Sequence, residues 1–447
     1  MTKKIPAILF ALFVIPVLTF ALPAKKTARK KIHTPEPKSK SEIVKPLTAS
    51  DADSKKRSFF DKVVSRLVIS FDSGPMILLP VMDSSKDLGP NYGIMPIWAL
   101  RDSSGKVIQS VIAPSVNYNR YLRTTYTYRH YVFPDDKKLL VARGSYSTVV
   151  QREVFLHYFD PELLGSRFRV NAEVRHWING KASFYGYGPD SMQRNQASYA
   201  LNMTGEEFTL DMPLFSDFFL DFTHSFYSYR VGRGPVVTLP QVKEAFPCEY
   251  TTASETKNHS IHKMALIFDD TDHPVLPRIG TYASLSAAFS RKALGSDYNY
   301  QTYTALLKHY YNHKEEGKYI TAVHYLIQKQ TGNRTPFYAQ PVLGEGTGLR
   351  AVGDGRFVDR GKMVINIEER IRLSRSPLLK FFSELELSPF LDMGTVFENP
   401  SAMRLDKFKL GPGVSFRIVI RPQVVGTADL AFGNEGTNAI IKVGYPF

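Results

Sequence analysis

Cysteine is almost absent from this chain of 447 residues. The one cysteine, Cys248, has no partner for an internal disulfide, so covalent cross-links cannot stabilise the fold. No long apolar run occurs after residue 20, which excludes a bundle of membrane-spanning helices. A chain that is 43% hydrophobic and has no such helices is either soluble or spans a membrane with strands.

Signatures of catalysis are missing as well. The sequence contains no Gly-x-Ser-x-Gly nucleophile elbow, no His-Glu-x-x-His zinc motif and no phosphate-binding loop. The groups closest to a catalytic set are His309, His313, His324, Asp269, Asp270 and Asp272. Histidine in a strand is more often a hydrogen-bonded wall residue. We therefore expect no catalytic residue, metal site or cofactor, and keep a rim-sited lipase or protease as a remote alternative.

The N-terminus has the pattern of an export signal. Lys3 and Lys4 precede the apolar stretch 5–20, and small residues follow at Ala21 and Ala24. This pattern predicts a cleaved secretory signal peptide over 1–24. The alternative is a membrane-anchoring helix, although the stretch is at the short end for a span.

The formal net charge of +15 is concentrated after this signal. Residues 25–57 are rich in lysine and arginine and contain three prolines but almost no aromatic residue. We interpret 25–66 as a basic, disordered periplasmic linker. It could contact anionic lipid headgroups or a periplasmic partner, or be a solvated tether. Nucleic acid is a poor candidate for an exported chain.

From about residue 90, stretches of alternating apolar and polar residues are separated by Gly, Asp, Asn, Ser or Pro. We interpret them as sixteen strands, near 91–101, 106–120, 122–133, 137–157, 166–178, 204–212, 216–231, 261–268, 281–290, 298–312, 317–331, 361–374, 380–394, 407–419, 423–433 and 437–447. An even number of antiparallel strands is typical of a closed outer-membrane barrel, and closure removes exposed sheet edges. The sequence therefore predicts an all-β fold, a 16-stranded antiparallel transmembrane β-barrel within 67–447.

The last strand supports a membrane barrel. One face carries Ile441, Val443, Tyr445 and Phe447, and the opposite face carries Asn438 and Lys442. A strand of a transmembrane β-barrel has this pattern, because one face contacts lipid, the other faces a wet lumen, and an aromatic residue lies at the membrane interface. We interpret the four apolar residues as the signal by which the barrel assembly machinery inserts the chain.

The strands before it divide in the same way. In 380–394, Glu384 and Asp392 lie on one face and Leu385 and Leu391 on the other. A charge that faces lipid at the bilayer centre costs ~2–4 kcal/mol, so the charged face should line the lumen.

Several motifs within 260–447 occur in the order seen in one family. They are Gly344-Glu345-Gly346-Thr347-Gly348-Leu349-Arg350-Ala351-Val352, Gly355-Arg356-Phe357-Val358-Asp359, Asn366-Ile367-Glu368-Glu369-Arg370 and Phe390-Leu391-Asp392-Met393-Gly394. An earlier hairpin, Phe268-Asp269-Asp270-Thr271-Asp272 with Pro277-Arg278-Ile279-Gly280, and the stretch Phe184-Tyr185-Gly186-Tyr187-Gly188 also fit. With these motifs, the chain over about 90–447 resembles the BamA/TamA-like outer-membrane assembly factors, or bacterial surface-antigen barrels.

The resemblance implies a site inside the barrel. A long loop after the eleventh strand would fold back into the lumen, and its arginine, Arg350, would dock on acidic wall residues. The strand pattern independently places loop 332–360 between the eleventh and twelfth strands and directs Glu368 and Asp392 to the lumen. An arginine fork on carboxylates makes short, charge-assisted bonds.

The expected loop motif is Gly348, Leu349, Arg350, Gly355, Arg356, Phe357 and Asp359. The expected wall partners are Glu368, Arg370, Phe390, Asp392 and Gly394. Ala351 and Val352 stand where relatives usually have glycine and an aromatic residue, so the turn there should differ.

The resemblance also implies a function. The sequence has no room for the tandem periplasmic POTRA domains that such factors normally carry, unless another polypeptide supplies them. We expect an outer-membrane protein that assists insertion or transport of proteins, or of lipids, with unfolded outer-membrane proteins or periplasmic proteins as possible partners. The alternative is a passive pore or a structural barrel with a plugged lumen.

Deletion of Phe447 tests the interpretation of the last strand. We expect the truncated chain to insert poorly into the outer membrane, because its closing strand loses the terminal aromatic residue. The measurement is the amount of heat-modifiable barrel in outer-membrane fractions. Normal assembly of the truncated chain would contradict the prediction.

Overall fold

The computed structural model describes residues 68–447 apart from 86–87, 103–107, 136, 275, 314–316, 379–380, 421–423, 444–445 and 447. The predicted signal peptide (1–24), the predicted linker (25–66), Tyr445 and Phe447 lie outside the described residues. Within them, no helix is both long and apolar enough to cross a membrane.

Most of the described residues belong to one 21-stranded sheet. Its strands are β1 (Val68–Phe71), β2 (Gly74–Ser85), β3 (Gly89–Arg101), β4 (Ile108–Ile112), β5 (Ser115–Asn119), β6 (Arg123–Val132), β7 (Leu139–Ser147), β8 (Arg152–Asp160), β9 (Arg169–Asn179), β10 (Ser183–Phe184), β11 (Ala197–Pro213), β12 (Phe218–Arg233), β13 (Lys257–Asp269), β14 (Gly280–Ser290), β15 (Tyr300–Asn312), β16 (Tyr319–Gly332), β19 (Gly361–Leu378), β20 (Phe381–Phe397), β21 (Lys409–Ile420), β22 (Val424–Gly433) and β23 (Gly436–Val443).

Shorter elements lie in the connections. They are β17 (Val342–Leu343), β18 (Phe357–Val358), α3 (Val242–Ala245), α4 (Pro247–Ala253), and the 3₁₀ turns η1 (Leu163–Gly165), η2 (Gln193–Asn195), η3 (Lys292–Leu294), η4 (Phe337–Ala339), η5 (Glu345–Thr347), η6 (Pro400–Ala402) and η7 (Leu405–Lys407).

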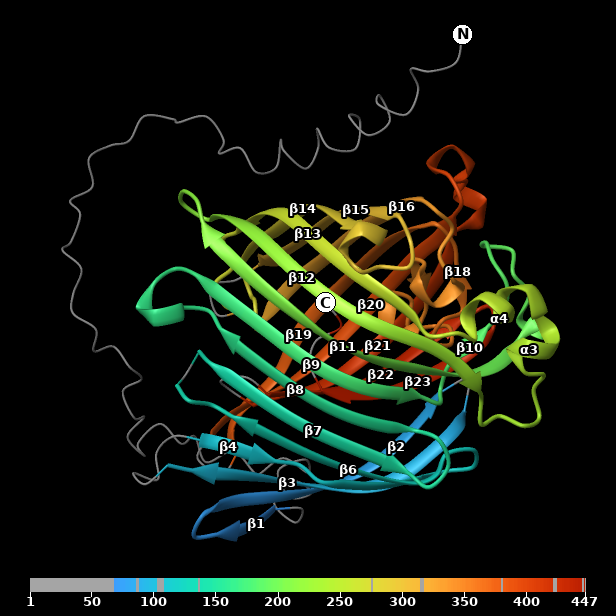
Figure 1. Cartoon of the computed structure of the whole chain (residues 1–447). Coiled ribbons are helices and arrows are strands. Elements are labelled where there is room, and N and C mark those ends of the chain that lie inside the picture. The colour runs from blue at the N-terminus through green and yellow to red at the C-terminus, as the bar shows by residue number, and fades with distance from the viewer. Residues whose placement is uncertain are drawn as a thin grey trace. The chain divides into compact units, whose positions relative to one another are not determined.

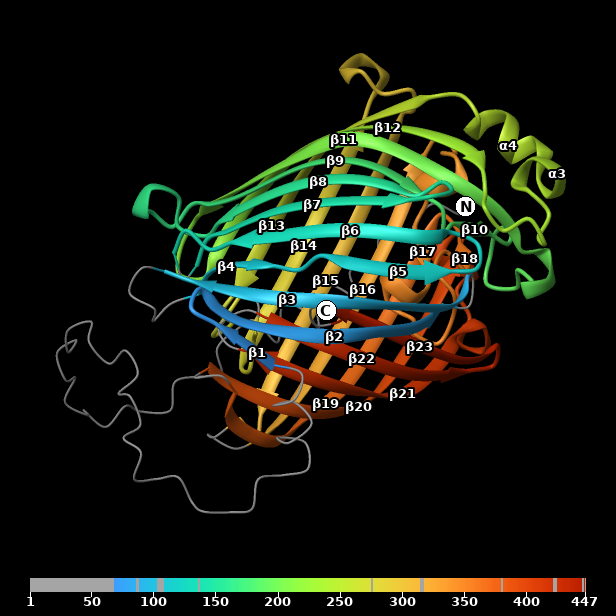
Figure 2. The ribbon, with the colours of Figure 1, turned by 90° about the horizontal axis from the view of Figure 1, so that it is seen from below.

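The sheet closes on itself as an antiparallel barrel (Figure 1). Each crossing pairs with the next along the chain, and β2 returns to β23 through Ser84 and Ala439. Figure 2 shows these two strands side by side. Among the described residues, β1 pairs only with β2 and β10 only with β11. β4 and β5 are two parts of one crossing, since both lie between β3 and β6. Counted in this way, the 21 described strands make 18 crossings.

The predicted number of sixteen strands differs from this count for two reasons. The segment predicted as one strand at 137–157 contains two, because the chain turns at 148–151 between β7 and β8. The Ser147 hydroxyl accepts hydrogen bonds from the backbone N–H groups of Val149, Val150 and Gln151, so this turn needs no glycine or proline. In addition, β2 lies before the first predicted strand. Both additional strands precede loop 332–360, so in the described sheet this loop follows the thirteenth crossing, β16, and not the eleventh as predicted. The five strands predicted after the loop correspond to β19 to β23.

The two faces of the wall differ as the alternation predicts. On β20, Glu384 and Asp392 are buried inside the barrel, while on β21 the alternate residues Leu410 and Phe416 are exposed outside. Exposed apolar side chains on an outer wall suit a lipid environment, and the polar inner face avoids the cost of placing charge in hydrocarbon.

Three long loops gather at one end of the barrel, where Figure 1 shows α3, α4, β10 and β18. Segments 180–196, 234–256 and 333–360 share an apolar core that includes Phe184, Val242 and Phe337. The ring of Phe184 stacks on Phe337 at 4.4 Å and contacts Phe246 at 4.8 Å. We call these three segments the loop cap. A common core means that they fold as one unit rather than as separate mobile loops.

Candidate functional site

The third segment of the loop cap, 333–360, connects β16 to β19 and packs against the inner wall. Its two short strands pair with each other, Val342 with Val358 and Leu343 with Phe357. Two residues of these strands, Leu343 and Phe357, form an apolar cluster with Leu349, Val352, Val364 and Val396. Since Val364 belongs to β19 and Val396 to β20, the cluster fixes the loop to the wall.

At the loop's tip, Arg350 docks on Asp392 of β20. Its Nε and Nη2 atoms donate to the two carboxylate oxygens at 2.9 and 2.7 Å, and its backbone N–H donates to the same group at 3.0 Å. Arg350 is 2% exposed and Asp392 is fully buried. A two-pronged bond of this kind fixes both position and orientation, which a lysine could not reproduce.

Other wall residues complete the Arg350 site. The guanidinium lies over the ring of Phe390, 3.3 Å from the ring centroid, and Nη1 donates to the Ser415 hydroxyl at 3.4 Å. Nη1 is also 3.7 Å from a carboxylate oxygen of Glu368 and from one of Asp429. The cation therefore contacts an aromatic face and three carboxylates.

Glu368 joins Arg350 to two further arginines. Arg417 of β21 donates to both of its carboxylate oxygens at 3.0 and 2.8 Å, and Arg370 donates to one at 2.7 Å. Arg370, Arg417 and Glu368 are all at most 2% exposed. We call Arg350, Arg370, Arg417, Glu368, Asp392 and Asp429 the ionic centre. Its formal charges cancel, which buried ion pairs need because desolvation is costly.

A glycine and an asparagine set the backbone at the tip. Gly348 has a φ of +116°, and a Cβ there would approach Val364 to 2.5 Å. Its carbonyl accepts a hydrogen bond at 2.8 Å from Asn366, which also donates to Asp392 at 2.7 Å. Only glycine satisfies both the conformation and the contact.

The wall also accounts for the unusual Ala351. Its methyl group is completely buried above two glycines of neighbouring strands, Gly411 of β21 and Gly433 of β22. A Cβ added at Gly411 would lie 2.7 Å from the Ala351 methyl, and one at Gly433 would lie 3.0 Å from it. The departure from the family pattern is thus accommodated by small residues on the opposing surface.

Arg356 ties the loop to the rest of the loop cap. It donates to Glu435 in the β22–β23 turn at 2.8 Å and to the hydroxyl and carbonyl of Ser191 at 2.9 and 2.7 Å. Its guanidinium also lies over the rings of Tyr185 and Phe357. Arg356 is therefore an outer cross-link, separate from the ionic centre.

The remaining predicted residues divide into packing and turn positions. Leu349 and Phe357 are buried in the apolar cluster, and Gly394 leaves room for Leu343. Gly355 has a φ of +72°. The Asp359 carboxylate accepts the Arg360 backbone N–H, so it stabilises a local turn rather than an ion pair with the wall.

The predicted insertion signal is only partly visible. Ile441 is 43% exposed on the outer face of β23, and Val443 ends that strand. Tyr445 and Phe447 lie outside the described residues, so their predicted role stays a prediction.

Sequence reasoning missed several contributors. Arg417, Ser415, Asp429 and Asn438 were not chosen as site residues, and the fork of Arg417 on Glu368 was not foreseen. Asn438 donates to the Arg350 carbonyl at 2.9 Å and to Glu345 at 3.0 Å. All are polar residues at inward positions of the last strands, which strand alternation could have indicated without giving their partners.

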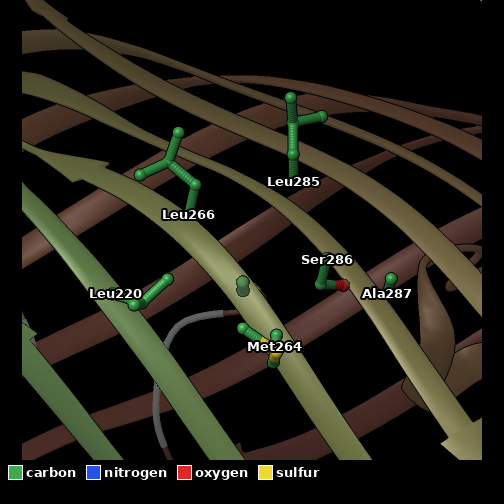
Figure 3. A pocket seen from close by; sticks show the side chains of 7 residues that line it. Leu220, Met264, Leu266, Leu285, Ser286 and Ala287 are labelled. Carbon is green, nitrogen blue, oxygen red and sulfur yellow. The ribbon is translucent and has the colours of Figure 1, made fainter.

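Other places in the barrel offer less chemistry. A shallow hollow on β12 to β14 is lined by Leu220, Met264, Ala265, Leu266, Leu285, Ser286 and Ala287 (Figure 3). Its nearly apolar lining suits hydrocarbon rather than a polar ligand. In the described part of the chain, no group of three or more His, Cys, Asp or Glu side chains could hold a metal ion.

Known proteins are similar to this chain in sequence and in fold. The Omp85 superfamily domain matches residues 138–421. The structure is similar to BamA from Haemophilus ducreyi lacking POTRA domains 1–3, at 14% identity and a TM-score of 0.51, over 82% of this chain and 74% of that one. CdiB from Acinetobacter baumannii also matches, at 10% identity and a TM-score of 0.41, over 83% and 60%. No curated protein matches the chain.

Replacing Arg350 by alanine tests the docking. Asp392 would be left as a buried carboxylate without its main cation, which should cost about 3–5 kcal/mol. We expect faster proteolysis within 333–360 and a lower temperature for the heat-induced shift in gel mobility. The control is Arg404→Ala, which removes a solvent-exposed ion pair with Asp406. Unchanged protease resistance and heat-modifiability of the Arg350 variant would contradict docking.

A pair of glycine substitutions tests the fit of the loop to the wall. Gly411→Ala should displace Ala351 and destabilise the docked loop by about 1–3 kcal/mol. Gly426→Ala is the matched control, because a Cβ at Gly426 meets nothing within 4 Å. The double variant Gly411→Ala/Ala351→Gly should recover heat-modifiability, and failure to recover it would refute this steric account.

Proposed function

Because this chain belongs to the Omp85 superfamily, a group of outer-membrane assembly and translocation factors, we propose that it assists the insertion or transport of proteins at the bacterial outer membrane. The observation that carries the proposal is the docked Arg350. Arg350 enters the barrel on a long loop and binds the wall with three donors. Burying this cation has a large desolvation cost, and a simple pore does not need such a loop.

The seam between the first and last crossings supports a wall that can open. Among the described residues, β2 and β23 pair only at Ser84 and Ala439, whereas β23 pairs with β22 along its whole length from Gly436 to Val443. Continuing the Ser84–Ala439 register would bring Pro80 opposite Val443. Proline has no N–H to donate, so pairing at that point is weakened.

An opening of this seam would expose unpaired backbone groups to an incoming chain. In lipid such groups must be satisfied, so an extended segment of an unfolded outer-membrane protein is a suitable partner. Apart from Arg350, the residues of the ionic centre lie on β19 to β22, next to the last strand, and they hold this side of the wall together. We propose that docking of Arg350 keeps the wall rigid while the seam exchanges partners.

A disulfide across the seam tests the proposal. Ser84→Cys with Ala439→Cys, in a Cys248→Ser background, should lock β2 to β23, because directly paired residues of antiparallel strands lie within reach of a disulfide. In cells that depend on this variant, we expect other outer-membrane or secreted proteins to be depleted, and a reductant to restore them. The measurement is quantitative proteomics of the outer membrane.

The control pairs the same Ala439→Cys with Leu430→Cys, which links β23 to β22, strands that are already fully paired. A locked seam that leaves the outer-membrane proteome at the control level would reject lateral opening. Depletion of the whole protein from cells is the second comparison. If the outer-membrane proteome is again unchanged, and outer-membrane extracts of the depleted cells have lost a conductance in planar bilayers, the barrel is a passive pore.

A further inference from the structure

A turn at the opposite end of the barrel from the loop cap also reaches into the lumen. It connects β13 to β14, and three of its residues, Leu276, Pro277 and Arg278, contact the inner side of strands β19 to β22. We call these three residues the inner latch. They lie in the motif that sequence analysis treated as a structural hairpin.

The hairpin is held rigidly by its own polar groups. The Asp272 carboxylate accepts the Arg278 backbone N–H at 2.8 Å, and the His273 ring accepts that of Leu276 at 3.0 Å. At the turn's end, Gly280 has a φ of +108°, and a Cβ there would lie 2.5 Å from the Asp270 carbonyl oxygen. The conformation that directs the inner latch inward is therefore built into the local sequence.

The inner latch has both an ionic and an apolar contact with strands β20 to β22. Arg278 donates from Nη2 to both carboxylate oxygens of Glu384, each at 2.9 Å. Leu276, only 2% exposed, packs on Val419 of β21 and Val425 of β22. Since β14 and β21 are not neighbours in the sheet, these contacts span the lumen.

The inner latch also touches the ionic centre. Arg370 donates from Nη1 to the Pro277 carbonyl at 3.2 Å and from Nε to Glu368 at 2.7 Å. Glu368 is in turn 3.7 Å from the guanidinium of Arg350. A continuous series of buried polar contacts thus joins the turn at one end of the barrel to the loop that enters from the other.

We propose that the inner latch and loop 333–360 are two coupled closures of one lumen, and that release of either weakens the docking of the other. The coupling runs through Arg370 and Glu368. If Leu276–Arg278 leave, Arg370 loses the Pro277 carbonyl and Glu384 loses its Arg278 donor. Glu384 is then left with the longer contacts of Arg372 and Arg375 of β19, at 3.8 and 3.6 Å, and a shift of Arg370 relative to Glu368 disturbs the pairing that Arg350 shares.

With this arrangement, displacement of the inner latch at one end of the barrel would weaken the docking of loop 333–360 at the other end. Buried ionic networks change in discrete steps, because an uncompensated charge in the interior is costly. A partner or client that displaces the inner latch would therefore lower the cost of undocking Arg350. No client needs to be known to test this coupling in the purified protein.

The test measures exposure of a buried position in the loop. A chain with Cys248→Ser and Val352→Cys carries one thiol, in a site that is 5% exposed in the docked loop. In detergent micelles, we expect Arg278→Ala to raise the rate of maleimide labelling at that thiol by at least about fivefold. The matched control is Arg143→Ala, which removes a lumen-wall ion pair with Glu153, 2.6 Å apart, on a different part of the wall.

The control should change labelling by no more than about twofold, as expected of distant sites. A labelling rate for Arg278→Ala equal to that of the control would overturn the proposal. Should Arg278→Ala not give a heat-modifiable barrel, Arg278→Gln keeps a polar side chain but removes the charge and the two-pronged bond to Glu384, and it carries the same expectation.

Reciprocity provides the second arm. With the thiol at Leu276→Cys instead, Arg350→Ala should raise labelling by a similar factor, because the coupling between two sites is the same in both directions. A response in one direction only would mean that the substitutions loosen the barrel locally, and the coupling would be rejected.

Discussion

The structure depends on a buried ionic centre in which formal positive and negative charges balance. Burying Arg350 alone would cost several kcal/mol, and so would burying Asp392 or Glu368 alone. Because each group needs the others, the loop cannot leave without stranding carboxylates on the wall, and the wall cannot rearrange without stranding the cation. Specificity rather than net stability is what such a centre provides: one position of the loop satisfies it and small displacements do not.

Shape reinforces charge at the same place. Gly394, Gly411 and Gly433 leave the inner wall bare where the loop lies against it, so that Leu343 and Ala351 occupy the space that side chains would fill. Close packing makes this contact sensitive to a single added methyl group. The loop and the last strands therefore have complementary surfaces. Gly411 and Gly433 accommodate Ala351, which departs from the family pattern.

Much of this arrangement could be predicted from sequence, because alternate residues of a barrel strand face lipid and lumen. A residue such as Asp392, in a strand whose neighbours are Leu391 and Met393, has only the lumen available to it, and the family resemblance supplied its partner Arg350. The pairing of Glu368 with Arg417 was not predictable, because the sequence of one strand does not determine its register with another.

The turn at 148–151 was missed because a single serine hydroxyl caps it. The inner latch was missed because its partners Glu384, Val419 and Val425 lie far along the chain, so the local sequence shows the shape of the turn but not what it contacts.

The loop cap has a consequence for immune recognition of the surface on which it lies. Its three segments come from distant parts of the sequence and share one apolar core, and Arg356 links the third segment to Ser191 of the first and to Glu435 in the β22–β23 turn. An antibody raised against the folded protein would therefore bind a discontinuous epitope. A synthetic peptide that copies any one segment lacks the partners that hold its shape, so an immunogen based on this surface has to present the whole barrel.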